Sequence, residues 1–495
     1  MIDINEYDNL EKVCDDILRF TQLSKTSPEA REYADELASL IGEKIKVPKS
    51  YSLMHGRCRL VYVFLVMYRQ FNDNRYLNKA MSLINDDIYE SIYSFYIDHG
   101  LCNGKAGMAL SLLWLYDHSP AERIRQMLTS CVEVMLRNFR PQKKGIASSY
   151  IDTHIAPPIN LKAGNAGQVY FFKTLLQYNG NRSIQTIIDG LVAYIDLSWS
   201  EKRKNWKDFT KRIDDFETQQ EFIANLENNN NSFFTRPSYD HSLWNGSTGI
   251  SLALSMNLDD LALPRKGTDK IPVLEHNLCK VISDNYCRYF FPKTSLTIAE
   301  LEPALLKDMS DLPIDRSFFT IFEKIIRKSK NKIVRDCFTY ENDKRKFREQ
   351  FSNRILLKTK EIVRFAKADE VLQLERSEIM KRRFKAPDNI VAIVSRWNWT
   401  GATTDDIKAN FNSPAGTHYS LLQGKVTHDG VVESTLTETQ LLFLEKFIEP
   451  TTVSEAADQL KNDFETAEES DRLIQKFIDE NLESFIFKRL ITPIS

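Results

Sequence analysis

The sequence lacks an excess of charge of either sign, and it lacks long apolar runs. Lysine and arginine number 66 against 68 aspartates and glutamates in 495 residues, a net charge of −2. Such a balance gives no overall field to attract nucleic acid or an anionic membrane. The longest apolar run, residues 60–68, is about half of the ~20 residues that a membrane span requires. We therefore expect neither nucleic acid nor membrane among the partners.

The sequence also lacks paired cysteines and a targeting segment. Its seven cysteines include no C-x-x-C, and an odd number without paired spacing is typical of a reducing compartment. The N-terminal residues MIDINEYDNLEKV are acidic and have neither the basic nor the apolar region of a signal peptide. We therefore expect a cytoplasmic protein whose cysteines are free thiols, mostly buried in the core.

Glycine is scarce, at 17 residues, yet it recurs in four similar segments. The segments read LMHGRCRLVYVFLVMY from Leu53, LCNGKAGMALSLLWLY from Leu101, LKAGNAGQVYFFKTLL from Leu161 and LWNGSTGISLALSM from Leu243. A glycine adopts φ > 0 without steric cost, so we expect the first glycine to allow a sharp turn into a helix and the second to allow close backbone approach. The motif glycines are Gly56, Gly104, Gly107, Gly164, Gly167, Gly246 and Gly249, with Arg59 replacing the second glycine of the first segment.

The residues after each motif predict buried helices. After Gly107 apolar side chains occupy nearly every position of residues 108–115, which is typical of a helix buried on all sides. Between motifs, stretches such as residues 121–139 alternate apolar and charged side chains at helical spacing. Inner and outer helices that alternate in this way predict an α/α toroid or barrel or, without closure, an α-solenoid.

The G-x-A-G and W-N-G-x-x-G-I elements resemble those of the lanthionine synthetase C-like (LanC-like) proteins over roughly residues 50–260. The family includes cyclases that close thioether rings in ribosomally made peptides, and its fold is a double α-toroid. Its cyclases hold zinc with two cysteines and one histidine, and the metal favours the substrate thiolate. The resemblance therefore implies a helical toroid. It also implies that any zinc ligands would lie in the motif loops.

The usual zinc ligands are incomplete in this sequence. Met54-His55-Gly56 offers a histidine, Cys102-Asn103-Gly104 offers a cysteine, and Trp244-Asn245-Gly246 offers neither. His99 is a third candidate, although nothing in the spacing requires it. Because two ligands complete neither a structural nor a catalytic zinc site, we predict no cofactor, with His55 and Cys102 as weak metal candidates.

Other catalytic signatures are weak. The sequence contains no P-loop, no G-x-S-x-G elbow, no H-E-x-x-H and no dinucleotide-binding fingerprint after a strand. Asp152 and His154 precede the third motif, where an acid–base pair would fit, but they are also ordinary residues for a proline-containing turn. They remain weak catalytic candidates.

The C-terminal part changes character. We expect domains at 1–290 (toroid), 291–385 (a charged helical segment that completes the toroid or links it) and 386–495. In the last, residues 389–395 predict a strand, and Asp429-Gly430 predicts a hairpin turn. Three helices follow, the first two opened by capping boxes at Thr437 and Thr452, and residues 486–491 predict a final strand. The order predicts an α+β winged-helix module in a mainly α protein.

Charge distinguishes two kinds of winged helix. The second and third helices expose more acidic than basic residues, which disfavours DNA binding. The phrase LTETQLLFLEKF followed by TTVSEAADQL resembles the PqqD-like domain, which recognises precursor peptides. The resemblance implies that a leader peptide is added to a sheet edge beside the third helix. The expected peptide-binding residues are Val431, Val432, Leu473 and Phe477.

Together these patterns predict an accessory or scaffold subunit of a ribosomal-peptide modification system. Its expected partners are a precursor leader peptide and a peptide-modifying enzyme. Two alternatives stay open, namely a lanthionine-type cyclase or other peptide-modifying enzyme with a non-standard metal site, and a winged-helix DNA-binding regulator.

Overall fold

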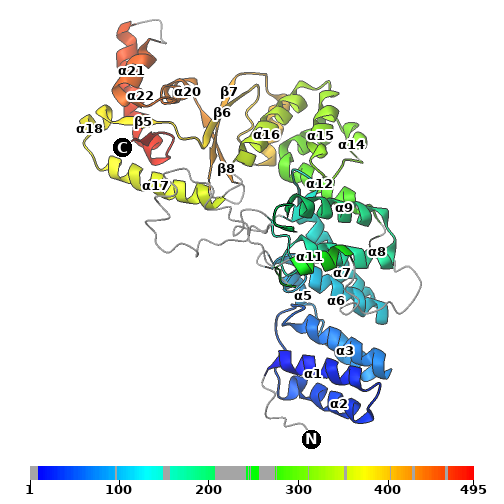
Figure 1. Cartoon of the computed structure of the whole chain (residues 1–495). Helices are drawn as coiled ribbons and strands as arrows, with labels where there is room; N and C mark the ends of the chain where they lie inside the picture. Colours follow the sequence, from blue (N-terminus) through cyan, green and yellow to red (C-terminus); the bar gives the residue numbers. More distant parts are fainter. Residues whose placement is uncertain are drawn as a thin grey trace. The chain divides into compact units, whose positions relative to one another are not determined.

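The computed structural model shows a mainly helical protein in two compact units (Figure 1). It describes residues 9–94, 97–148, 157–206, 241–243, 245, 247–255, 274, 276–309, 311–350, 354–401, 403–425, 430–462 and 467–494. Of these described residues, the first unit contains those within 1–212, 235–286 and 311–321, and the second contains those within 287–310 and 322–495. Within the described residues no helix combines the length and the apolar character of a membrane span.

Helical hairpins build the first unit. The pairs α1 and α2, α3 and α4, α6 and α7, and α8 and α9 pack as neighbours along the chain. The helices are α1 (Leu10–Leu23), α2 (Pro28–Glu43), α3 (Arg57–Phe71), α4 (Asn74–Ser82), α5 (Ile88–Tyr93), α6 (Lys105–His118), α7 (Glu122–Asn138), α8 (Asn165–Asn179), α9 (Arg182–Leu197), α11 (Ser247–Ser255) and α12 (Leu278–Phe290). Two short antiparallel hairpins join them: β1 (Phe139–Pro141) with β2 (Ile146–Ser148), and β3 (Trp199–Ser200) with β4 (Asn205–Trp206).

The first helices of the later hairpins, α3, α6 and α8, form the interior of this unit. Helices α1, α3, α6, α8 and α11 pack against one another in chain order. Helix α6 is buried on every face, as its apolar sequence predicts, whereas α7 buries one side and exposes its charged side. The alternation of inner and outer helices is confirmed, although the glycine repeat does not predict the hairpin of α1 and α2, which precedes the first motif.

The glycine motifs work by close approach rather than by a left-handed backbone. Gly56, Gly104 and Gly164 each precede a helix with φ of −118°, −103° and −113°, so the expectation of φ > 0 is wrong. A Cβ on Gly104 would lie 2.5 Å from the Gly100 nitrogen, and one on Gly56 2.4 Å from the Ser52 nitrogen. The extended backbone suits any residue, but the space beside it admits only glycine.

The second glycines bring successive repeats together. A Cβ on Gly107 would lie 2.9 Å from Leu53 Cβ, and one on Gly167 would lie 3.0 Å from Leu101 Cβ. A Cβ on Gly249 would lie 2.9 Å from Leu161 Cβ in the same way. Each second glycine therefore receives the leucine that opens the preceding motif.

Backbone hydrogen bonds also join the motif loops. The Met54 N–H donates to the Cys102 carbonyl over 3.1 Å, and the Cys102 N–H donates to the Lys162 carbonyl over 3.0 Å. Because these bonds link equivalent positions of consecutive motifs, the loops form a continuous row at the same end of the inner helices.

The second unit combines helices with two small sheets. Its helices are α13 (Pro292–Leu301), α14 (Leu305–Asp308), α16 (Lys332–Gln350), α17 (Arg354–Leu372), α18 (Arg376–Lys381), α19 (Thr404–Ala409), α20 (Glu438–Glu445), α21 (Val453–Lys461) and α22 (Ala467–Phe487), and the division between the units falls within α12 and α15 (Ser317–Arg327). One antiparallel sheet has the order β6 (Ile390–Ser395), β7 (His418–Gly424), β8 (Val431–Leu436). The other has the order β10 (Thr492–Pro493), β5 (Arg383–Lys385), β9 (Thr451–Thr452).

The sheet of β6, β7 and β8 contacts a core on each face. Leu422 of β7 packs into a cluster with Trp399 and residues of α16. Its neighbour Leu421 points to the opposite face and packs into a cluster with α20, α21 and α22. Successive side chains of a strand alternate between faces, so Leu421 and Leu422 contribute to different cores on opposite faces of the sheet.

Several C-terminal predictions are confirmed and one is wrong. Both capping boxes form, at Thr437 with Gln440 and at Thr452 with Glu455. The predicted strand at residues 486–491 is wrong, because α22 continues through Phe487 and the last strand is β10. The residues 426–429 of the predicted hairpin turn lie outside the described residues, while β7 and β8 pair on either side of them. The domain boundary near 386 stays a prediction.

Candidate functional site

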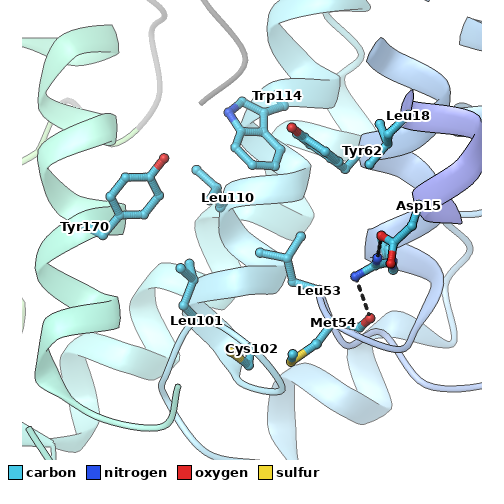
Figure 2. Close-up of a pocket in the computed structure, with 11 residues that line it drawn as sticks. Asp15, Leu18, Leu53, Met54, Tyr62, Leu101, Cys102, Leu110, Trp114 and Tyr170 are labelled. Atoms are coloured by element: carbon cyan, nitrogen blue, oxygen red, sulfur yellow. Dashed lines mark hydrogen bonds and ion pairs between the residues drawn. The ribbon is translucent and has the colours of Figure 1, made fainter. Parts of the chain in front are cut away.

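A cavity of about 340 Å³ lies among the inner helices and motif loops of the first unit (Figure 2). Three residues at the same position in successive repeats line it: Tyr62 of α3, Leu110 of α6 and Tyr170 of α8, each six residues after the first glycine of its motif. The motif leucines Leu53 and Leu101 close one end. The repeat itself therefore builds the walls of the cavity.

The aromatic wall includes a buried polar group. Trp114, one turn beyond Leu110, packs against Tyr62 with ring centroids 5.4 Å apart and a tilt of 45°. Only 2% of Trp114 is exposed, and its Nε1–H has no hydrogen-bond partner among the described residues. Figure 2 shows the Trp114 nitrogen and the Tyr170 hydroxyl facing the space between α6 and α8.

An ion pair forms another part of the lining. Arg59, which replaces the second glycine of the first motif, donates from Nη2 to the Asp15 carboxylate of α1. Its Nη1 donates to the Met54 carbonyl over 3.2 Å. Arg59 therefore places a positive charge in the lining, and the paired Asp15 carboxylate largely neutralises it.

Two sulfur atoms lie at the loop end of the cavity. Met54 and Cys102 belong to neighbouring motif loops, and Figure 2 shows their side chains together below Leu53 and Leu101. Cys102 is 2% exposed, and burial raises the pKa of its thiol to about 12. The thiol is therefore protonated at neutral pH and is a poor nucleophile.

The two histidine candidates do not line the cavity. The His55 ring is half-exposed, and its Nδ1 lies 3.9 Å from a Glu11 carboxylate oxygen. His99 is buried in the loop before α6, where burial and the nearby charges of Lys105 and Arg140 lower its pKa to about 3. The structure brings Met54 and Cys102 together but places both imidazoles elsewhere.

These residues do not fit the zinc that LanC-like cyclases hold. A thioether is a weak zinc ligand, the Cys102 thiol is protonated, and the described residues that line the cavity include no histidine. In the described part of the chain, no group of three or more His, Cys, Asp or Glu side chains is arranged to hold a metal ion. We therefore derive no chemical step through zinc.

Three predicted site residues lie outside the described residues. They are the weak catalytic candidates Asp152 and His154 and the motif glycine Gly246. Helix α11 nevertheless begins at Ser247, directly after the fourth motif glycine, as the other inner helices do after theirs.

The predicted peptide-binding residues lie on β8 and α22 of the second unit. On β8, an edge strand of its sheet, Val431 is buried and Val432 is 37% exposed. On α22, Leu473 is 61% exposed, and Phe477 one turn later is half-buried against Phe443. Two of the four side chains, Val432 and Leu473, are therefore open to a partner.

The exposed face of α22 is acidic, as the sequence predicts. Its exposed charged side chains within residues 471–483 are two basic and four acidic ones: Arg472, Lys476, Asp471, Asp479, Glu480 and Glu483. A helix that reads DNA neutralises phosphates, and an excess of acidic side chains disfavours that role.

Sequence reasoning missed the aromatic residues that line the cavity. Tyr62, Trp114 and Tyr170 were not predicted as site residues, because the predicted sites followed the motif glycines and the zinc-ligand positions. The signal was present in the aligned segments, where tyrosine, leucine and tyrosine share one position after the first glycine.

One part of the chain is similar to a known protein family. Residues 17–158, from within α1 to the segment after β2, match the family model described as Lanthionine synthetase C-like protein. No match was found among curated proteins. The matched segment contains the first two glycine motifs with Met54 and Cys102, so the part of the chain that forms one end of the cavity is similar to LanC-like proteins.

Proposed function

We propose that this chain is an accessory subunit of a ribosomal-peptide modification system, which binds the precursor and presents it to a partner enzyme. The observation that carries the proposal is the cavity at the LanC-like motif loops, where Met54 and a protonated Cys102 stand at the zinc-ligand positions. A LanC-like interior with such a lining suits binding of a peptide side chain better than activation of a thiol. In this proposal the inner helices form a toroid that shelters the core of the precursor.

The second unit is proposed to bind the leader of the same precursor. The order of β6, β7 and β8 followed by α20, α21 and α22 supports a PqqD-like winged helix. The edge strand β8 offers backbone hydrogen bonds to an extended peptide, and the exposed Val432 and Leu473 offer apolar contacts. Backbone pairing then provides affinity, while the apolar contacts select the leader.

Leader binding by the full chain tests this proposal. The probe is a fluorescein-labelled peptide encoded by a short open reading frame beside the gene, and fluorescence anisotropy measures its affinity. We expect a Kd near micromolar, about −8 kcal/mol. Leu473→Glu is expected to weaken binding at least tenfold, because the new carboxylate would replace an apolar contact with the peptide.

The matched control is Ile448→Glu, since Ile448 is 63% exposed and lies outside β8 and α22. It should leave the affinity unchanged. Equal effects of the two substitutions, or no binding by the wild-type chain, would reject leader recognition at this surface.

A further inference from the structure

The cavity of the first unit has the character of a binding site for one neutral ring. Its volume of about 340 Å³ falls within the ~300–1,000 Å³ typical of small-ligand pockets. Leu53, Leu101 and Leu110 supply aliphatic surface, and Tyr62, Trp114 and Tyr170 supply aromatic surface. Aromatic rings pack favourably against one another in offset or edge-to-face arrangements, so an aromatic ligand suits this lining.

The charge of the lining favours a neutral ligand. Among the described residues of the lining, Arg59 is the one cation, and it donates to the Asp15 carboxylate and the Met54 carbonyl. A second carboxylate that entered the cavity would compete with Asp15 and would lose its hydration against apolar walls. The ligand should therefore carry no net charge inside the cavity.

The Trp114 side chain indicates that the ligand also carries a hydrogen-bond acceptor. Its indole N–H is buried, faces the cavity and lacks a hydrogen-bond partner among the described residues. Buried donors are nearly always satisfied, so the group that completes this site carries an acceptor oxygen opposite Nε1. A phenol provides such an oxygen on a flat, neutral ring.

We propose that this cavity binds the phenol side chain of a tyrosine in a partner peptide, without a metal. The ring would lie between α6 and α8, and its oxygen would accept a hydrogen bond from Trp114 Nε1–H. The inference deepens the proposed sheltering role of the first unit, and it rests on that role only for the choice of a peptide as the source of the tyrosine.

Binding of two blocked amino acids to the full chain tests the assignment. N-acetyl-tyrosine amide and N-acetyl-phenylalanine amide are titrated by saturation-transfer NMR, with and without EDTA. The tyrosine amide should bind roughly two- to tenfold more tightly, which corresponds to one neutral hydrogen bond. EDTA should change neither affinity.

Two variants and one control test whether the ligand binds in this cavity. Trp114→Phe keeps a ring but removes the N–H, so it should abolish the preference for tyrosine while phenylalanine amide still binds. Leu110→Trp should fill the cavity and prevent binding of both. Leu23→Trp is the control for an added indole, because Leu23 is 44% exposed on α1 and does not line the cavity.

Several results would overturn the assignment. They are no binding of either amide, no preference for tyrosine in the wild-type chain, a preference that survives in Trp114→Phe, and loss of binding on addition of EDTA. Tighter binding of free tyrosine than of the blocked amide would also overturn the peptide as its source. A chain that binds these amides but not the labelled leader peptide would reject the leader proposal alone.

Discussion

Replacing Gly107 by alanine is expected to destabilise the first unit by about 3 kcal/mol, although alanine favours helices. Gly107 lies in the first turn of α6, where helix propensity alone would stabilise alanine by up to ~1 kcal/mol. A Cβ there would lie 2.0 Å from the Leu101 carbonyl oxygen and 2.9 Å from Leu53 Cβ. Overpacking of this kind costs about 1–3 kcal/mol or more, and backbone on one side leaves little room to adjust.

Differential scanning calorimetry measures this effect as a lower transition temperature. For a unit of this size ~3 kcal/mol corresponds to roughly 6–12 °C. Gly416→Ala is the matched control, because the nearest atom to its Cβ would be His418 Nε2, at 3.5 Å. A Gly107→Ala protein that melts with the wild type would show that the motif loops do not pack as described.

Replacing Glu433 by glutamine is expected to destabilise the second unit by about 3–5 kcal/mol. The Glu433 carboxylate of β8 bonds with Lys293 of α13 over 3.0 Å and with Lys344 of α16, and it accepts from the Tyr340 hydroxyl over 2.7 Å. These charged side chains are between 11% and 18% exposed. Removal of one member leaves buried positive charge without its partner, which costs far more than the loss of an exposed pair.

The pH dependence of this network follows from the same contacts. Burial favours the neutral carboxyl, but Lys293 and Lys344 outweigh it and hold the pKa of Glu433 below its ordinary value of 4.5. Because the folded pKa is lower than that of the unfolded chain, the stabilisation is present above about pH 4.5 and is lost as the pH falls further.

Calorimetry at neutral pH measures the effect, with Glu480→Gln as control. Glu480 and Lys476 form a 3.7 Å pair on α22 with side chains that are 61% and 71% exposed, so its loss should cost under ~1 kcal/mol. Equal shifts for the two variants would contradict a stabilising role for the buried network.

The helical repeats were predictable because their signals are local. An all-apolar stretch after a glycine identified α6 as an inner helix, and apolar residues at helical spacing identified α7 as an outer one. The capping boxes at Thr437 and Thr452 were equally clear, because both partners lie within four residues. Such patterns need no knowledge of the tertiary structure.

The wrong predictions concern conformations that the packing of the chain decides. The first motif glycines were expected at φ > 0, but the backbone of the same loop, such as Ser52 beside Gly56 and Pro158 beside Gly164, fills the space beside them, and the sequence does not show this crowding. Residues 486–491 are rich in apolar side chains and were predicted as a strand, yet α22 continues through Phe487, and Ile486 and Leu490 belong to the same buried core as residues of α20 and α21. The cavity was missed because Tyr62, Leu110 and Tyr170 meet only after the inner helices pack.

Metal content of the purified chain tests the central claim most directly. The claim is that the LanC-like motif loops enclose a cavity that binds a peptide side chain without zinc. Inductively coupled plasma mass spectrometry of protein purified without chelator and with zinc in the growth medium is expected to find well under one zinc per chain, unchanged by Cys102→Ala. Close to one zinc per chain that disappears in Cys102→Ala would contradict the account and would favour a cyclase with unusual ligands.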